Sequence, residues 1–193
     1  MLSFFHTQEK QIFLGNALFV ICCGFYLAWW LLAFKPTGAI TGMKSGWLLI
    51  PACITGLLGV ILAIRGIFLE TPTEQLLPNR YILLGGIAVY IILLVITALP
   101  FKRPVTSELL LIVGWGTLAF AEVNLLFGIG LFSHRLSIGF LVFIGSTIAI
   151  SLVCYILYYR LDSRAGYIDG MVPLLLAAFV MAVILCFMLI SNK

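Results

Sequence analysis

Two polar side chains interrupt the apolar stretch GWGTLAFAEVNLLFG, which covers residues 114–128. A carboxylate, Glu122, lies in this stretch, and an amide, Asn124, follows two residues later. A charged side chain at the centre of a membrane helix costs about 2.5–3.5 kcal/mol on insertion scales. We therefore expect Glu122 to face protein or water rather than lipid, where its carboxyl group can take up and release a proton.

The two polar groups are predicted to serve different contacts. Asn124 lies about 200° around a helix from Glu122, at about 100° per residue. The face of Glu122 also holds Trp115, Leu118, Ala119, Leu125 and Leu126, whereas the face of Asn124 holds Thr117, Phe120, Ala121 and Gly128.

Three roles for Glu122 are open at the level of sequence. It can form an interhelical hydrogen bond that fixes packing, act as a titratable group in a polar path for protons or a small solute, or contact a partner subunit. Asn16 and Arg65 are the other strongly polar residues within apolar runs. Asn16 lies near the start of its run, and Arg65 lies near the end of its own, where its side chain can reach the head groups.

A second polar group of residues lies in RLDSRAGYIDG, residues 160–170. Arg160 and Arg164 can hold a phosphate, and Asp162 and Asp169 are seven residues apart. We expect an ordinary solvated turn in which Asp169 caps the last helix. A headgroup or anion site is the alternative, and catalysis on lipid headgroups is the third reading.

Other chemistry finds little support in the sequence. The two histidines, His6 and His134, lie near segment ends, so neither bis-histidine ligation of two haems nor an H-E-x-x-H metal site is possible. The five cysteines form no C-x-x-C pair, and no glycine-rich phosphate loop occurs. The sequence predicts no catalytic residue, no metal site and no cofactor, and the protein is expected not to be an enzyme.

The elements that must position these residues follow from composition. Of 193 residues, 63% are hydrophobic and only 9% are charged, whereas a soluble domain carries about 25% charged residues. The mean hydropathy is +1.22. Apolar runs of about 20 residues, the length that crosses a bilayer, cover 12–34, 47–68, 81–99, 109–132, 138–159 and 171–190. We predict an all-α polytopic membrane protein whose six helices form a single transmembrane domain over residues 1–193.

The basic residues indicate a bilayer partner rather than a nucleic acid. The net charge is +4, but the Lys and Arg side chains lie mainly at segment ends, where they meet lipid head groups. One set of turns holds Lys35, Lys44, Lys102, Arg103, Arg160 and Arg164, and the other side holds Lys10, Arg65, Arg80, Arg135 and Lys193. Without Arg65, which lies inside an apolar run, six basic residues stand against four. The positive-inside rule then favours both termini outside, in the plasma (inner) membrane.

Short loops predict that successive helices pack as antiparallel neighbours. The stretch 45–69 aligns with 107–131 through Ser, Leu, Leu, Ile, Thr, Gly, Ile and Leu, and KQIFLG at 10–15 is similar to RYILLG at 80–85. We therefore predict three tandem helical hairpins, at about 10–70, 80–132 and 135–190, as parallel repeats. Unrelated helices that share a Leu-rich composition are the alternative.

Small residues form a stripe on the second helix of each of the first two hairpins. In the first hairpin, alternating spacings of four and three place them on one helix face: Ala52, Gly56, Gly59, Ala63 and Gly66. In the second, the stripe thins to Gly114, Ala121 and Gly128. Because small residues let membrane helices approach closely, we interpret both stripes as packing seams. A pore lined by glycine is the alternative.

This pattern resembles the hairpin repeats of HdeD-type acid-resistance membrane proteins, which have an early Gly, a turn Pro and small residues seven apart. Its members here are Gly15, Pro36, Gly59 and Gly66 in the first hairpin, and Gly85, Pro104, Ala121 and Gly128 in the second. The third hairpin departs from it, with Gly139, Ala178 and Ala182 but no turn Pro. The resemblance implies a six-helix architecture and a role in stress tolerance.

Three functions are therefore considered. The first is a non-enzymatic membrane protein that passes a small, mostly uncharged solute or a proton near Glu122, or that acts in membrane stress tolerance. The second is a non-catalytic integral subunit of a larger membrane complex, as a homo-oligomer or with other membrane subunits. The third is a membrane enzyme that acts on lipid headgroups through residues 160–169.

Overall fold

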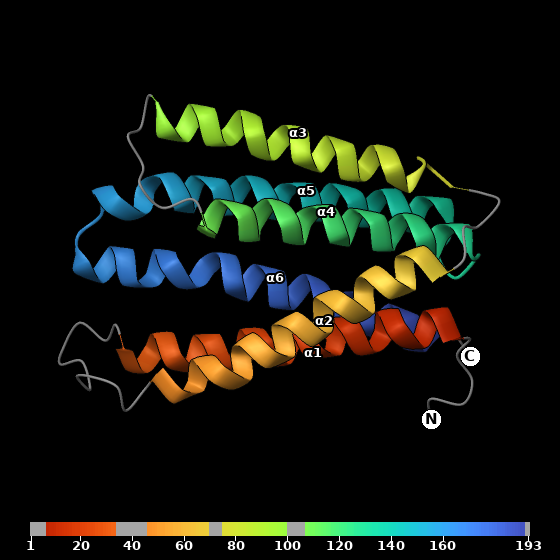
Figure 1. Cartoon of the computed structure of the whole chain (residues 1–193), viewed down its shortest axis with the longest axis horizontal. Helices are drawn as coiled ribbons and strands as arrows, with labels where there is room; N and C mark the ends of the chain where they lie inside the picture. The colour runs from red at the N-terminus through yellow and green to blue at the C-terminus, as the bar shows by residue number, and fades with distance from the viewer. Residues whose placement is uncertain (1–6, 34–45, 70–74, 100–106, 192–193) are drawn as a thin grey trace. The chain divides into compact units, whose positions relative to one another are not determined.

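The computed structural model describes residues 7–33, 46–69, 75–99 and 107–191. Six long helices occupy these ranges (Figure 1), and the described residues contain no strand. They are α1 (Thr7–Ala33), α2 (Leu49–Leu69), α3 (Asn79–Ala98), α4 (Ser107–Gly128), α5 (His134–Leu157) and α6 (Ser163–Ser191), with 3-10 turns at Gly46–Leu48 and Tyr158–Arg160. All six helices are long and apolar enough to cross a membrane. The predicted all-α, multi-pass membrane class is confirmed.

The chain divides into two compact units. The first unit comprises Met1–Thr71 and Ile156–Lys193, and it contains α1, α2 and α6. The second comprises Pro72–Tyr155 and contains α3, α4 and nearly all of α5. The two helices of the third predicted hairpin, α5 and α6, thus belong to different units, while the first two hairpins each lie within one.

In the first unit, α1 and α2 cross in contact along the predicted stripe of small residues (Figure 1). The closest approach joins Gly15 of α1 to Gly59 of α2. A Cβ atom added to Gly59 would lie 3.1 Å from the carbonyl oxygen of Gly15, and one added to Gly15 would lie 3.1 Å from the backbone nitrogen of Ala63. Because backbone atoms line both sides of this contact, the predicted packing seam on α2 is confirmed.

The seam extends in both directions from this crossing. A Cβ on Gly66 would approach Cγ1 of Ile12 to 2.7 Å, and one on Gly56 would approach Sγ of Cys22 to 3.1 Å. Gln8 donates a hydrogen bond from Nε2 to the carbonyl oxygen of Gly66 at 2.8 Å. The contacting positions on α1 therefore have the same alternating spacing of four and three as those on α2, which is how antiparallel helices pack along one seam.

The third helix of this unit, α6, packs against α1 through Trp30, which is only 9% exposed. Its indole Nε1 donates a hydrogen bond to the carbonyl oxygen of Tyr167 at 3.1 Å. Gly170, one helical turn further on, leaves room for the indole ring, since a Cβ there would collide with Trp30. A glycine and a tryptophan thus complement each other in shape at this helix contact.

The start of α6 differs from the prediction. The helix begins at Ser163 rather than 171, and Asp162 instead of Asp169 acts as its cap, because Oδ1 of Asp162 accepts a hydrogen bond from the backbone nitrogen of Ala165 at 2.9 Å. Asp169 lies within the helix. The apolar run therefore begins inside α6, and the start of the helix itself is set by the cap at Asp162.

In the second unit, α3 packs against α4 at Gly86, where an added Cβ would collide with the side chain of Thr117. Phe132, in the turn after α4, stacks on Phe140 of α5 with ring centroids 5.2 Å apart. Gly114, which was predicted to belong to a seam, has nothing within 4 Å of an added Cβ, so that prediction is wrong.

The end of α4 also differs from the prediction, which placed it at 132. The helix ends at Gly128, and Gly130 adopts a φ of +76°. The backbone nitrogen of Leu131 then donates to the carbonyl oxygen of Leu126 at 3.0 Å. A glycine in the left-handed region commonly ends a helix in this way, although the apolar composition continues beyond it.

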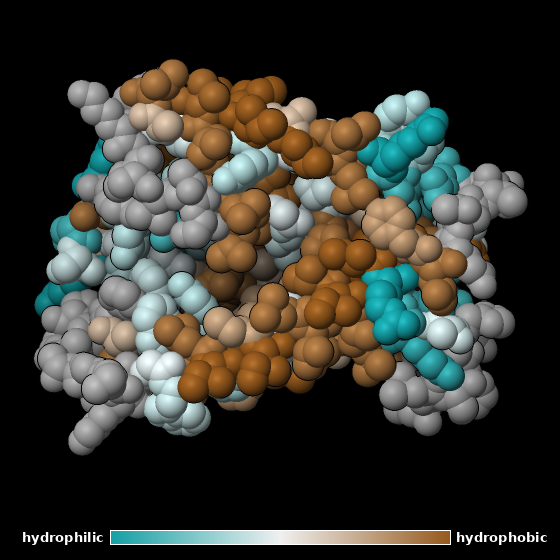
Figure 2. All heavy atoms as spheres, viewed as in Figure 1, coloured by the Kyte–Doolittle hydropathy of each residue, from teal (hydrophilic) through white to brown (hydrophobic). Residues whose placement is uncertain are grey.

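Burial differs strongly among the helices. In the apolar 18-residue stretch of α3 that is long enough to cross a membrane, 6% of the stretch is buried inside the protein. In the corresponding stretch of α4, 56% is buried. Exposed apolar side chains run along α3, with Leu84 61% and Ile92 57% exposed, and Figure 2 shows this apolar surface over α3 and α2. Apolar side chains of this kind can face lipid, whereas α4 buries the polar side chains of Glu122 and Asn124 inside the protein.

Candidate functional site

Glu122 is fully buried, with 0% of its surface exposed. All six residues from Ala121 to Leu126 are buried with it. Because α4 ends at Gly128, Glu122 lies about 9 Å from the C-terminal end of its helix, at about 1.5 Å per residue. The carboxyl group is therefore nearer to the end of its helix than in the predicted helix over 109–132.

Asn124 is also buried, at 1% exposure, and its role is clear from its contacts. Its Oδ1 accepts hydrogen bonds from the backbone nitrogens of Leu76 at 2.9 Å and Leu77 at 3.2 Å. Its Nδ2 donates to the carbonyl oxygen of Leu77 and to Oδ1 of Asn79, both at 2.7 Å. The amide uses all four of its hydrogen-bonding positions.

These four bonds hold the segment that leads into α3. Residues 75–78 are not helical, and Pro78, at the start of α3, supplies no side-chain cap. Backbone N–H and C=O groups that lie within the membrane outside a helix must be hydrogen bonded by other parts of the protein. Asn124 meets this need from a helix 45 to 48 residues away in the chain, so its amide is committed to structure.

Asn16, the third polar candidate, lies in the first unit and is 0% exposed. Its Nδ2 donates to the carbonyl oxygen of Ile12, one turn earlier in α1, at 3.1 Å. It follows Gly15, the residue at the centre of the seam between α1 and α2. Asn16 is thus buried inside the first unit and bonded to its own helix.

The residues considered for a headgroup or anion site surround the start of α6. Arg160, Asp162 and Arg164 are exposed, and the carboxylate of Asp162 is engaged in the cap. Asp169 is half-buried in the second turn of the helix. Asp162 therefore has a structural role as the cap of α6.

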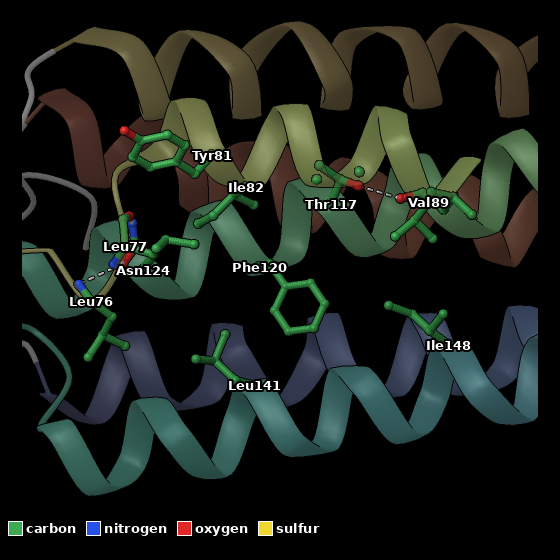
Figure 3. A pocket seen from close by; sticks show the side chains of 13 residues that line it. Leu76, Leu77, Tyr81, Ile82, Val89, Thr117, Phe120, Asn124, Leu141 and Ile148 are labelled. Carbon is green, nitrogen blue, oxygen red and sulfur yellow. Dashed lines mark hydrogen bonds between the residues drawn. The ribbon is translucent and has the colours of Figure 1, made fainter. Parts of the chain in front are cut away.

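A cavity of about 360 Å³ lies between α3, α4 and α5 in the second unit (Figure 3). Its walls include Tyr81, Gly85 and Val89 of α3, Thr117 and Asn124 of α4, and Ile148 of α5. Sequence reasoning missed it because its walls come from three helices. The adjacent glycines 85 and 86, which remove side-chain volume from α3, were the one local signal.

Together, the six apolar helices and the buried carboxylate define a multi-pass membrane protein with a fully buried acidic side chain, Glu122, in its interior. A comparison of the chain with protein-family models, curated proteins and solved structures finds no match.

Proposed function

We propose that this membrane protein is not an enzyme and that it passes a proton or a small, mostly uncharged solute at Glu122. The observation that carries the proposal is the complete burial of Glu122 in α4. Of the six helices, α4 has the largest buried share of its apolar stretch. A buried acid in a membrane helix is costly, and such residues commonly mark ion and proton paths.

The contacts of the neighbouring amide support this assignment. Asn124 spends its hydrogen-bonding capacity on the segment before α3, so Glu122 is the polar group of this stretch that can take part in transfer. Glu122 lies about 9 Å from the end of its helix, which leaves a short path for a proton to the turn that follows α4. A role in membrane stress tolerance, which the HdeD-type pattern implies, is compatible with proton transfer at this residue.

A second candidate function is that of a non-catalytic integral subunit of a larger complex, formed with further copies or with other membrane subunits. The nearly unburied apolar length of α3 favours it, because a partner helix can pack there as readily as lipid. Purification in native detergent distinguishes the two candidates, since a complex of one fixed mass is expected only for the subunit.

The functional test is Glu122→Gln in proteoliposomes that contain a pH-sensitive dye. Gln keeps the size and hydrogen bonding of Glu but cannot titrate. We expect proton flux under a pH gradient to fall at least about tenfold, because one proton-transfer step is lost. The melting temperature should be unchanged. Uptake of small uncharged solutes, followed by light scattering, is measured on the same vesicles.

Glu108→Gln is the matched control, because Glu108 lies in the first turn of the same helix and is exposed. It should leave flux unchanged. If Glu122→Gln conducts like the wild type at every pH and for every solute, Glu122 is a packing residue and the proposed function is wrong. Glu122→Leu, which also removes the hydrogen bonds, should impair folding as well.

The orientation that we propose places both termini outside, as the distribution of basic residues favours. Single cysteines at residues 40 and 105, outside the described residues, test it in a chain without its five native cysteines. A membrane-impermeant thiol reagent added outside should label neither position until the vesicles are opened. Rapid labelling of both from outside would reverse the orientation.

A further inference from the structure

The cavity between α3, α4 and α5 has walls whose polar groups are already hydrogen bonded. Asn124 uses all four positions, and Thr117 donates from Oγ1 to the carbonyl oxygen of Val113 at 2.8 Å. The hydroxyl of Tyr81 accepts from Arg80 at 3.3 Å. A water molecule needs two to four polar partners to occupy a cavity stably. Because the polar groups of these walls are already bonded, few of them can bond a water molecule. The interior therefore suits an apolar occupant.

The shape of the cavity suits an extended chain. Its lining on α3 runs from Tyr81 to Val89, about 12 Å along the helix axis. Figure 3 shows Asn124, Leu76 and Tyr81 at one end and Val89 and Ile148 at the other. The cavity opens beside Gly85, which is exposed and has nothing within 4 Å of an added Cβ. Lipid can therefore enter sideways from the bilayer.

A cation stands at the end of the cavity near the start of α3. Arg80 is exposed, and its guanidinium lies 4.9 Å from the centroid of the Tyr81 ring that lines the cavity. Among the described residues, its contacts are confined to Tyr81. A guanidinium at this position can bind an anionic lipid head group with its remaining donors.

From these observations we propose that the cavity binds one acyl chain of an anionic phospholipid of the surrounding bilayer, with the lipid head group at Arg80. The chain fills the apolar space along α3, and the phosphate forms charge-assisted hydrogen bonds with the guanidinium. This site is separate from the function proposed for Glu122, because Glu122 does not line the cavity.

Photo-crosslinking tests the site in phosphatidylcholine vesicles that contain a small fraction of phosphatidylglycerol with a photoreactive acyl chain. Phosphatidylcholine and a free fatty acid with the same photoreactive chain are the comparison probes. Mass spectrometry of peptides locates the attached lipid. We expect phosphatidylglycerol to label residues of the cavity at least threefold more than phosphatidylcholine does.

Two pairs of variants make the test specific. Gly85→Leu fills the cavity from a position with open space and should reduce labelling at least fivefold, whereas Gly139→Leu, at an exposed and equally open glycine of α5, should not. Arg80→Gln should lower phosphatidylglycerol labelling to the phosphatidylcholine level. Arg135→Gln, which like Arg80 is the second residue of its helix, should leave it unchanged.

Val89→Trp fills the other end of the cavity and replaces Gly85→Leu if that variant does not fold. The proposal is overturned if filling the cavity leaves labelling unchanged, if labels spread evenly over the exposed faces of all helices, or if only the fatty acid labels the cavity. Loss of labelling in the filled variants while proton flux persists would support the site and show that it is independent of Glu122.

Discussion

Replacing Gly59 with leucine should destabilise the contact between α1 and α2 by about 3 kcal/mol, near the upper end of the usual cost of overpacking. An added Cβ at Gly59 lies 3.1 Å from the carbonyl oxygen of Gly15, and Leu18 and Phe19 flank it at 3.5 Å. A backbone oxygen cannot rotate aside as a side chain can. The two helices must therefore separate, and the contacts at both ends of the seam weaken together.

Thermal unfolding in detergent measures the effect, with Gly24→Leu as the matched control. Gly24 is an exposed glycine of α1 with nothing within 4 Å of an added Cβ, so the same substitution there should be nearly neutral. Gly59→Ala should lie between the two, because its single Cβ forces a smaller separation. Equal melting temperatures for the two leucine variants would contradict a close seam at Gly59.

The hairpin repeat adds a third variant to this series, because Ala121 aligns with Gly59. Ala121 is fully buried, and Ala121→Leu should be harmful, though less so than Gly59→Leu, since an alanine already keeps neighbouring helices further apart. A harmless Ala121→Leu beside a harmful Gly59→Leu would retain the seam and count against the repeat.

The second large effect is expected for Asn124→Leu, which removes four hydrogen bonds at once. Each buried backbone group left without a partner costs about 1–3 kcal/mol, and the substitution deprives the backbone nitrogens of Leu76 and Leu77 of their acceptor. The loss of the acceptor for these two nitrogens should together lower the free energy of unfolding by about 3 kcal/mol. Amide hydrogens of the segment before α3 should also exchange much faster.

Hydrogen exchange followed by mass spectrometry separates this local release from a general loss of stability. Thr117→Val is the control, because the Thr117 hydroxyl bonds only within α4 and valine keeps its shape. It should change stability by less than about 1 kcal/mol and leave exchange at residues 76–79 as in the wild type. If Asn124→Leu also leaves that exchange unchanged, the segment is held by other contacts.

Local patterns in the sequence were sufficient for the membrane class and for one side of the main helix contact. Length and hydrophobicity predict six spans because the requirement for bonded backbone acts within each helix. The stripe from Ala52 to Gly66 is visible because helical periodicity gathers its members on one face. Its partner on α1 was less visible, since Gly15 is a single small residue among larger ones.

Helix ends were predicted less well, because they depend on a few polar or glycine contacts rather than on composition. The apolar run continues past Gly128, but the positive φ of Gly130 ends α4 there. Similarly, α6 begins at Ser163, eight residues before the predicted start at 171, because Asp162 caps it by accepting a hydrogen bond from the backbone nitrogen of Ala165.

The chain by itself determined that Glu122 and Asn124 point to different faces of one helix, since that follows from helical geometry alone. Only the tertiary structure decided what each face meets. Asn124 finds its partners 45 to 48 residues earlier, on a segment whose path no local pattern reveals. The cavity beside it likewise exists because three helices leave space where Gly85 lacks a side chain, and such space belongs to no single stretch of sequence.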